Sequence, residues 1–443
     1  MNGHESEPAD LLVIGAGMAG MSAAARAASQ GARVVVLERG DHVGGSAIYA
    51  GFVWTAPTVE VMREVNPLGD ADLSRLVVEG FPGGVEWIRS LGVDCRPQVT
   101  VLRYGRGHQV DTTHYLSRCE QLVKERGGEV LTRTSARSLV YDGAVRGADC
   151  KLPDGSTRRV LARWTLLATG GFQGDPALRA ELIHPHAGAL PLRANPYSVG
   201  DGLRLGRAVG AAVGEPGAGC YGHLVPAGVP LSDPSMFVDL ALYYSEHALL
   251  FNLRGERFVD ETAGDHLTTI ALLDQPQARG LLVADAAVHR EWITGSYVEG
   301  IPGLDKFALA SRRGARCAVT DSLADFDDMP AEWGYPGPAI RAALEEFNAT
   351  VAAAGQPHPG RAYDRRALTE PPYYVLEAAP AITFTFTGLL VDSSMRVRSG
   401  TGTPIPGLLA AGADTGGLYH RAYAGGLAPA LVFGLTAADT ALT

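Results

Sequence analysis

Two short apolar runs near the start of the chain predict buried parallel strands on either side of a helix. Residues 11–14 and 34–37 are continuously apolar, which is typical of strands covered on both faces. Between them, an alanine-rich segment predicts a helix that ends at Gly31. The pattern therefore predicts a βαβ unit within an α/β fold.

Glycines stand in the first turn of this unit at the spacing that dinucleotide-binding proteins use. Gly15 permits a tight turn, Gly17 lets the backbone approach a pyrophosphate, and Gly20 brings the helix against the strand. The start of the helix offers N–H groups to that anion. Glu38 stands 21 residues after Gly17, where a carboxylate accepts hydrogen bonds from adenosine ribose hydroxyls. The alternative is a glycine-rich turn that binds no ligand.

Three later apolar stretches predict a β-meander that returns to the main sheet. They cover residues 130–141, 144–152 and 159–168, and Asp-Gly pairs separate them, which is a strong hairpin signal. Further helices are expected at residues 58–92, 115–126, 203–213 and 341–353, and a pair of strands at 371–388.

A stretch rich in glycine and proline, residues 215–235, indicates a crossing into a second domain. We expect residues 1–222 and 368–443 to form one domain, with residues 223–367 inserted as the other. A chain of 443 residues is long enough for this organisation.

Composition narrows the classes of partner. The net charge of −10 argues against nucleic acid and anionic membrane surfaces, and no apolar run is long enough for membrane insertion. The first ten residues carry no export signal, and the five cysteines are scattered without a CxxC pair. We therefore expect a cytoplasmic protein with no metal site and no disulfide framework, whose cysteines are small core residues.

Glycine-rich segments further along the chain carry a family resemblance. They are GGS followed by Gly51 in residues 44–51, ATGGF at 168–172, LLFNLRGERFVDE at 249–261 and PIPGLLAAGADTGG at 404–417. Together with the first glycine turn, they resemble the fumarate reductase/succinate dehydrogenase flavoprotein superfamily over nearly the whole chain. The resemblance implies a Rossmann-like FAD-binding domain of the GR2 type, with a β-meander, and an inserted α+β cap domain.

The resemblance also implies which residues hold FAD. They lie in the glycine turns, after the second strand, and in the turns and helix starts toward the C-terminus: Gly15, Gly17, Ala19, Gly20, Glu38, Arg39, Gly44, Gly45, Ser46, Gly51, Thr169, Gly170, Gly171, Asp201, Gly412, Asp414, Gly426, Leu427 and Ala428. Asp201 is equally an ordinary helix N-cap.

The residues that carry fumarate chemistry in this superfamily are replaced. The positions of its proton-donating arginine, carboxylate-binding pair, substrate-clamping arginine and relay arginine hold Asp265, Thr383 with Phe384, Tyr423 and Tyr244. Fumarate and succinate are therefore not the expected substrates. Residues 382–389 and 44–54 are instead similar to the tricarballylate dehydrogenase-like and 3-ketosteroid dehydrogenase-like branches.

The candidate catalytic residues are Tyr423, Tyr244, His266 and Arg421. In the ketosteroid branch, a tyrosine at the Tyr423 position polarises the ketone or serves as the acid/base. A phenol with a pKa of about 10 donates a hydrogen bond to a carbonyl, and a cation nearby lowers that pKa. Each candidate has a structural alternative: core packing for both tyrosines, a satisfied histidine at 266 and a solvated charge at 421. For Asp265, a helix cap is favoured over a proton donor.

The function implied is that of an FAD-dependent oxidoreductase acting on a CH–CH bond next to a carbonyl or carboxylate. Hydride would move to or from flavin N5, with a tyrosine as acid/base, and desaturation is favoured over reduction. The substrate would be a small molecule, and the electron acceptor or donor is not identified by the sequence. Two alternatives stay open: a biosynthetic tailoring oxidase, hydroxylase or cyclase on a larger substrate, and a non-redox or electron-transfer FAD-binding protein.

Overall fold

The computed structural model describes residues 7–295 and 303–443, which form two compact units. The first unit contains the residues up to His184 together with Ala194–Cys220 and Phe384–Thr443. The second contains Pro185–Arg193 and Tyr221–Thr383. The domain limits expected at 222/223 and 367/368 stay predictions, because a unit is defined by contacts and a domain by independent folding.

The first unit is built on a largely parallel sheet whose strand order is β15-β16-β9-β1-β2-β6. Its strands are β1 (Ala9–Ile14), β2 (Val34–Leu37), β6 (Glu129–Leu131), β9 (Thr157–Leu167), β15 (Arg396–Arg398) and β16 (Pro404–Ala410). β1 pairs in parallel with β2 on one side and β9 on the other, so Leu12 lies between Val35 and Thr165. The expected βαβ unit is confirmed, and the C-terminal segment supplies the sheet's other edge.

The expected β-meander is also confirmed. β7 (Ser135–Tyr141) pairs antiparallel with β8 (Val145–Lys151), and β8 pairs antiparallel with the long strand β9. A separate antiparallel sheet joins β3 (Phe52–Thr55), β5 (Gly105–Gln109) and β4 (Val99–Val101). In this small sheet, residue 107 must be glycine because a Cβ there would lie 2.3 Å from Cβ of Trp54.

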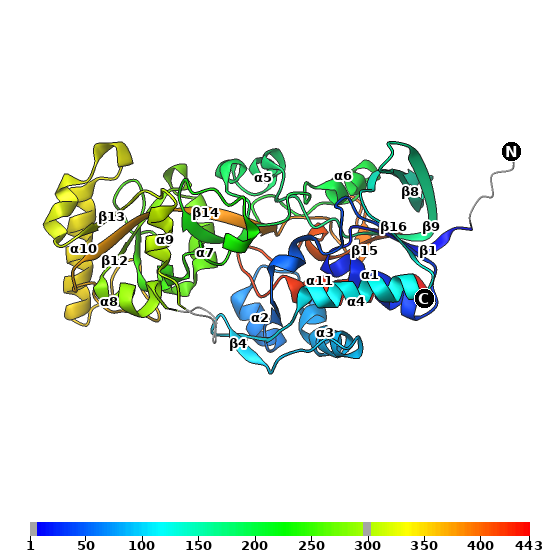
Figure 1. The fold of residues 1–443 in the computed structure, drawn as a ribbon, viewed down its shortest axis with the longest axis horizontal. Coiled ribbons are helices and arrows are strands. Elements are labelled where there is room, and N and C mark those ends of the chain that lie inside the picture. The colour runs from blue at the N-terminus through cyan, green and yellow to red at the C-terminus, as the bar shows by residue number, and fades with distance from the viewer. Residues whose placement is uncertain (1–6, 296–302) are drawn as a thin grey trace. The chain divides into compact units, whose positions relative to one another are not determined.

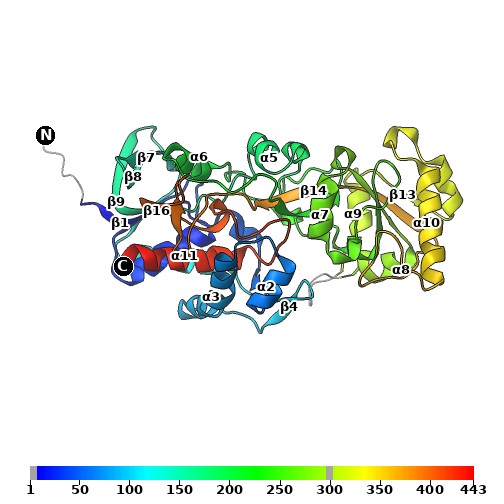
Figure 2. The same cartoon turned by 180° about the vertical axis from the view of Figure 1, so that it is seen from behind.

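Helices of the first unit pack with glycines at their contacts. α11, drawn in red, lies beside α1 in both views (Figures 1 and 2). A Cβ on Gly434 of α11 would lie 2.3 Å from the carbonyl oxygen of Ala19 on α1, so only glycine allows this close approach. The helices are α1 (Met18–Ser29), α2 (Val59–Val65), α3 (Ala71–Ser90), α4 (Thr112–Glu125), α5 (Pro176–Leu182), α6 (Asp201–Ala208) and α11 (Leu427–Leu442).

Two helix predictions in this unit need correction. The single helix expected over 58–92 is broken between α2 and α3, where Asn66 ends the first helix and Asp70 caps the second through the Asp72 and Leu73 N–H groups. The helix expected over 203–213 ends at Ala208, because Gly210 adopts a positive φ and ends the helical turn.

The second unit contains an antiparallel sheet of order β10-β14-β12-β11, with β13 also paired to β14. Its strands are β10 (Cys220–Pro226), β11 (Leu249–Phe251), β12 (Gly280–Ala284), β13 (Cys317–Thr320) and β14 (Tyr373–Thr385), and its helices are α7 (Asp265–Leu273), α8 (Ala286–Val288), α9 (Lys306–Arg312) and α10 (Gly337–Ala352). The expected strand pair at 371–388 is wrong. These residues form the single 13-residue strand β14, which runs through Pro380 without a turn.

Candidate functional site

In the first glycine turn, close packing requires glycine at two positions and leaves space for a side chain at a third. A Cβ on Gly15 would lie 2.2 Å from the Ala168 oxygen, and one on Gly20 would lie 1.9 Å from the Gly15 oxygen. A Cβ on Gly17 would meet only the Gly44 oxygen, at 3.9 Å. Gly17 caps the N-terminus of α1 without a side-chain hydrogen bond, and the first turn of α1 carries no acid. This open, electropositive position suits a phosphate group.

Glu38 holds the glycine turn in place. Its carboxylate, in a residue that is 8 % exposed, accepts hydrogen bonds from Ala16 N at 2.8 Å and from Gly40 N at 2.6 Å. A carboxylate has lone pairs beyond these two, which can accept hydroxyl groups of a ribose. Glu38 therefore orders the site even before a cofactor arrives.

The second glycine segment lies directly against the first. Gly44 N donates to the Ala16 oxygen at 2.8 Å, and a Cβ on Gly45 would lie 3.4 Å from Cα of Gly17. Ser46 Oγ accepts a hydrogen bond from Asn195 N at 3.1 Å, while a Cβ on Gly51 would meet nothing within 4 Å. The sequence expectation that both segments serve one ligand is consistent with this contact.

Asp414 ties together the turns that lie at the carboxyl ends of β9 and β16. It is buried, and it accepts hydrogen bonds from Thr169 N, from Thr169 Oγ1 at 2.9 Å and from Gly171 N at 2.9 Å. Burial raises the pKa of this carboxyl, although these hydrogen bonds act in the opposite direction. Thr169 Oγ1 in turn accepts from Gly202 N at the start of α6. Asp414 thus positions three predicted FAD-binding segments.

Asp201 does not cap α6. The N-cap is Gly200, in the left-handed conformation, and Asp201 is the first helical residue. Its side chain forms an ion pair with Arg39, the residue after Glu38. Two predicted cofactor residues from distant parts of the sequence are thereby brought together.

The start of α11 places its backbone beside aromatic rings. Gly426 caps the helix, and a Cβ there would lie 3.0 Å from Cε1 of Phe384. Leu427 and Ala428 form the first turn, which contains no acid. A helix end of this kind stabilises negative charge that develops on a bound group.

Tyr423 lies in an aromatic cluster just before this helix. Its ring contacts Trp54 at 5.2 Å, Phe384 at 5.9 Å and Tyr419 at 5.9 Å between centroids, and only 6 % of the residue is exposed. The Tyr104 hydroxyl donates to the Tyr423 carbonyl oxygen, and burial lifts the pKa of Tyr104 above the usual range. We call these five residues the aromatic cluster.

The loop that carries Tyr423 is anchored at both flanks. Asn66, buried between α2 and α3, donates to the Leu418 oxygen at 2.6 Å and accepts from His420 N at 3.2 Å. Arg421 N donates to the Ala218 oxygen at 2.7 Å, and Arg421 holds a φ of 50°, which is strained for a side chain of this kind. Arg421 is exposed.

The other candidate catalytic residues lie in the second unit. Tyr244 is 4 % exposed within its hydrophobic core, and burial raises the pKa of its phenol far above the usual range. His266 is 3 % exposed, and burial lowers its pKa to about 4, so the imidazole is neutral at pH 7. The burial of Tyr244 therefore favours a packing role over a catalytic one. The catalytic roles of Tyr244 and His266 stay predictions.

Sequence reasoning misses a buried His–Asp pair. Nδ1 of His223 lies 2.5 Å from Asp265 Oδ2, and Nε2 lies 2.9 Å from the Tyr221 hydroxyl. Asp265 is the first residue of α7, whose N-cap is Gly264, so the helix-cap interpretation of Asp265 is wrong. The available signal is the alternation of Tyr221 and His223 on one face of a strand.

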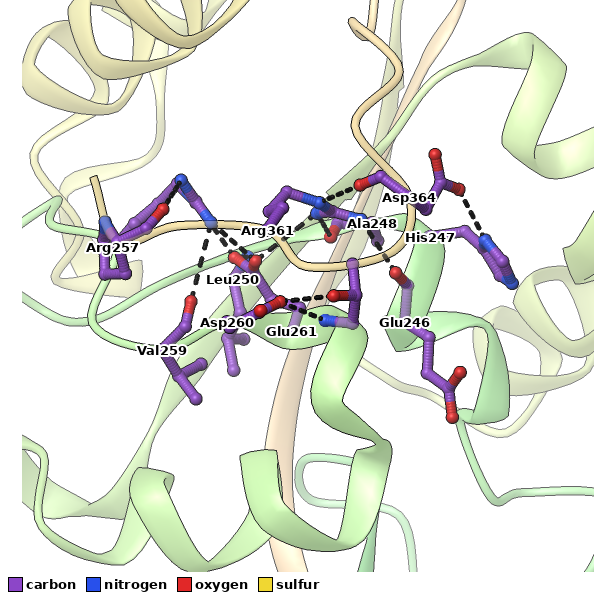
Figure 3. Close-up of polar contacts among 12 residues, drawn as sticks. Glu246, His247, Ala248, Leu250, Arg257, Val259, Asp260, Glu261, Arg361 and Asp364 are labelled. Carbon is purple, nitrogen blue, oxygen red and sulfur yellow. Dashed lines mark hydrogen bonds and ion pairs between the residues drawn. The ribbon is translucent and has the colours of Figure 1, made fainter. Parts of the chain in front are cut away.

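The segment 249–261 forms a closed ion-pair network, shown in Figure 3. Glu261, with no exposed surface, accepts from Arg257 Nη2 at 2.7 Å, from Arg361 Nη1 at 3.3 Å and from Leu250 N at 3.0 Å. Arg361 also donates to the Ala248 oxygen at 2.8 Å. The conspicuous arginine and acid of this motif therefore stabilise the second unit and are not free to react.

Comparison with known proteins identifies the class of this site. A family model described as an FAD binding domain matches residues 10–427. The chain is 25 % identical to a fumarate reductase (cytochrome) of Shewanella frigidimarina over 98 % of this chain and 76 % of that protein. It is 26 % identical to a vinyl phenol reductase of Lactiplantibacillus plantarum over 94 % of this chain and 91 % of that protein.

A solved structure has the same fold. The 3-ketosteroid-Δ4-(5α)-dehydrogenase of Rhodococcus jostii RHA1 aligns with a TM-score of 0.79 at 20 % identity, covering 100 % of this chain and 98 % of that one. The protein is thus a flavoprotein with a Rossmann-like FAD-binding fold. It belongs to the FAD-binding family of the fumarate reductase/succinate dehydrogenase superfamily, and it is an FAD-dependent oxidoreductase of the CH–CH class.

The glycine turns fit this cofactor. Gly17 has open space where a Cβ would stand, α1 presents its N-terminal N–H groups beside it, and Glu38 keeps acceptor capacity for ribose hydroxyls.

Among the residues that the structure describes, no helix is both long and apolar enough to cross a membrane.

Replacing Gly17 with alanine tests whether the first glycine turn binds FAD. The added methyl group meets no protein atom closer than 3.9 Å, so we expect folding to be kept and FAD to bind at least about tenfold more weakly. Titration of the apoprotein with FAD, followed by flavin fluorescence, measures this. Gly83→Ala, where a Cβ meets nothing within 4 Å, is the control and should bind FAD normally. Equal affinities for the two variants would contradict the assignment.

His266 makes stability depend on pH. Its pKa is about 4 in the folded protein, against an ordinary value of 6.5, so the unfolded chain binds the extra proton first. The contribution of His266 to the free energy of unfolding is therefore complete above pH 6.5, and it falls by up to about 3 kcal/mol as the pH decreases toward 4. His266→Gln should reduce this slope without abolishing it, because burial also lowers the pKa of His223. Urea unfolding between pH 4 and 7 measures it, and an unchanged slope would contradict the assignment.

Proposed function

We propose that this flavoprotein desaturates a CH–CH bond next to a carbonyl group in a small, largely apolar substrate, with Tyr423 donating a hydrogen bond to that carbonyl. The observation that carries the proposal is the aromatic cluster immediately before α11. Trp54, Phe384 and Tyr419 surround the Tyr423 ring, and the charged side chain nearest in sequence, Arg421, is exposed. The aromatic cluster suits a flat or cyclic compound more than a dicarboxylate.

The names of the relatives show that proteins similar to this chain act on different kinds of substrate. They include a fumarate reductase, a vinyl phenol reductase and a ketosteroid dehydrogenase. The vinyl phenol and ketosteroid enzymes act, by name, on aromatic or cyclic compounds. The position of Tyr423 in an aromatic environment supports that side of the family for this chain.

Bound FAD supplies a two-electron acceptor for hydride. The residues of the chain would perform the remaining work. The phenol of Tyr423 would hold the carbonyl oxygen and so make the neighbouring C–H more acidic. Trp54 and Phe384 would exclude water from the apolar part of the substrate.

Anaerobic mixing tests the proposal. The purified holoprotein is mixed with saturated cyclic ketones, with the matching enones after chemical reduction of the flavin, and with polycarboxylates. We expect cyclic ketones to bleach the flavin absorbance and enones to restore it. If only polycarboxylates react, or none of these compounds does, the proposal is wrong. Oxygen consumption with peroxide release during turnover would identify a tailoring oxidase instead.

A further inference from the structure

A single side chain at the break between α2 and α3 holds the loop that leads to Tyr423. Asn66 Nδ2 donates to the Leu418 oxygen at 2.6 Å, and Asn66 Oδ1 accepts from His420 N at 3.2 Å. We call these two hydrogen bonds the Asn66 clamp. Asn66 is 2 % exposed, so both polar ends of a buried carboxamide are used on a loop 352 positions further along the chain.

We propose that Asn66 is a positioning residue for the reaction: its carboxamide fixes the loop so that the Tyr423 phenol keeps one orientation toward the substrate carbonyl. This inference rests on the proposed function, since it explains how the hydroxyl assigned to that carbonyl is held in place. Asn66 acts through the loop and is assigned no contact with the substrate. All of these residues belong to the first unit.

The helix α2 does not need the Asn66 side chain. Asn66 ends this helix through its backbone N–H, which donates to the Met62 oxygen at 2.9 Å, and Pro67 disfavours a further helical turn. A Cβ on Gly69 would lie 2.0 Å from Asn66 Nδ2 and 2.4 Å from the Leu418 oxygen. The segment after α2 therefore has a glycine where the clamp leaves no room for a side chain, and the carboxamide serves the loop.

The clamp fixes the peptide groups on both sides of Tyr419, because it binds the carbonyl of Leu418 and the N–H of His420. The Tyr419 ring packs beside the Tyr423 ring, with centroids 5.9 Å apart. The Tyr419 hydroxyl donates to the Gly425 oxygen at 2.7 Å, and the residue is 3 % exposed. One rigid side chain thus spans the loop, and Tyr423 lies inside the span.

Backbone strain in the loop makes an external support necessary. Arg421 has a φ of 50°, a conformation that residues with a side chain rarely adopt. Arg421 N donates to the Ala218 oxygen at 2.7 Å, which holds the strained residue itself. The clamp holds the preceding residue through His420 N. Without the clamp, the strained backbone can relax and move Tyr423, which follows two residues later.

The first test compares Asn66→Ala with the wild type as holoproteins. With a ketone that bleaches the wild-type flavin, we expect Asn66→Ala to slow flavin reduction by about tenfold or more, because a displacement on the order of 1 Å separates the phenol from the carbonyl. The flavin spectrum and the ketone Kd should change little, since the aromatic cluster is kept. Stopped-flow absorbance measures the rate, and its dependence on ketone concentration gives the Kd.

Asn66→Asp provides a rescue that depends on pH. A neutral carboxyl group has a hydroxyl donor and a carbonyl acceptor, as the carboxamide does, whereas a carboxylate only accepts. Burial raises the pKa of a carboxyl group at such a site. We therefore expect the rate of Asn66→Asp, divided by the wild-type rate at the same pH, to rise as the pH falls from about 8 to about 5.

The ratio of rates cancels the titration of His420 and Asp70, the histidine and carboxylate of the segments in contact, because both occur in each protein. The same ratio for Asn66→Ala should stay constant, since alanine has no group to protonate. The rescue is measured within one variant, so it decides the matter even if Asn66→Ala loses FAD.

The chain offers a matched control. Asn348, on α10 in the second unit, donates from Nδ2 to the Leu368 oxygen at 2.7 Å and accepts from Leu368 N at 2.8 Å. This carboxamide makes the same pair of hydrogen bonds to a backbone segment that does not carry Tyr423. Asn348→Ala and Asn348→Asp should therefore reduce their flavin at the wild-type rate, with a constant ratio across this pH range.

Two measurements report on the loop without turnover. Amide hydrogen exchange in the peptide covering residues 417–425 should be faster in Asn66→Ala, because His420 N loses its acceptor. The carbonyl stretching frequency of an enone bound to the oxidised holoprotein falls when a phenol donates to its oxygen. That frequency should return toward the free value in Asn66→Ala and fully in Tyr423→Phe, and Asn348→Ala should change neither measurement.

The outcomes separate this inference from the proposed function. If Tyr423→Phe slows flavin reduction while Asn66→Ala reacts at the wild-type rate, the inference is overturned and the proposed function stands. The inference is also overturned if Asn66→Ala and Asn348→Ala slow reduction equally, if Asn66→Asp shows no rescue, or if exchange at 417–425 is unchanged. If no carbonyl compound changes the flavin of the wild type, the proposed function fails, and the inference fails with it.

Discussion

Replacing Glu261 with alanine is expected to lower the free energy of unfolding by about 3–5 kcal/mol, because it leaves buried charges without their partner. Arg257 and Arg361 both donate to this carboxylate, and their side chains are 4 % and 2 % exposed. Glu261 itself has no exposed surface. Both guanidinium groups are therefore almost completely shielded from water. Urea unfolding followed by circular dichroism measures the loss.

Glu256 provides the control in the same segment. Its side chain is 59 % exposed and pairs loosely with Arg254 at 3.8 Å. Surface pairs of this kind contribute about 1 kcal/mol or less, so Glu256→Ala should change stability only slightly. If the two alanine variants were equally stable, the network around Glu261 would not hold the unit together. A loss of catalysis in Glu261→Ala without a loss of stability would instead indicate that the motif takes part in the reaction.

Tyr423→Phe is expected to keep FAD bound and to slow flavin reduction by about 10²-fold. The variant keeps the ring, so the contacts with Trp54, Phe384 and Tyr419 remain. It loses only the hydroxyl that the proposed function assigns to the substrate carbonyl. Stopped-flow absorbance under anaerobic conditions measures the rate, and the flavin spectrum of the purified variant reports occupancy.

A tyrosine outside the aromatic cluster controls for the general effect of removing a hydroxyl. Tyr197 is 52 % exposed, so Tyr197→Phe should reduce its flavin at the wild-type rate. If Tyr423→Phe does the same, Tyr423 is a packing residue and the substrate carbonyl is held elsewhere. If Tyr423→Phe loses FAD, the Tyr423 hydroxyl has a structural role. The kinetic comparison must then include Tyr419→Phe as a second packing control, because the Tyr419 hydroxyl donates to the Gly425 oxygen at 2.7 Å.

Local patterns predict the parts of the fold that depend on local physics. The runs at 11–14 and 34–37 form β1 and β2, and the Asp-Gly turns mark the meander. The glycine turn predicts a bound dinucleotide, and the family resemblance implies that it is FAD, which the family model confirms. A pair of strands is expected over 371–388 because the segment is rich in β-branched and aromatic residues, whereas pairing with β12 and β13 keeps β14 extended as one strand.

Contacts between distant residues are beyond sequence reasoning. Asp265 meets His223 across 42 positions, and the pair forms only because α7 begins beside β10. Likewise, Arg39 and Asp201 are both expected to touch the cofactor, yet their mutual ion pair depends on where the turn after β2 meets α6. Tyr244 is selected by its place in a motif, which says nothing about the hydrophobic core that surrounds it.

The interrupted first unit has a consequence for synthesis. β16 pairs with β9, and α11 packs on α1, but both come from the segment Phe384–Thr443 at the end of the chain. As the ribosome elongates the chain, Tyr221–Thr383 emerges whole while the nascent nucleotide fold still exposes one edge of β9 and a bare face of α1. The cofactor site therefore gains its last turns, around Asp414 and Gly426, only after the whole second unit has been synthesised.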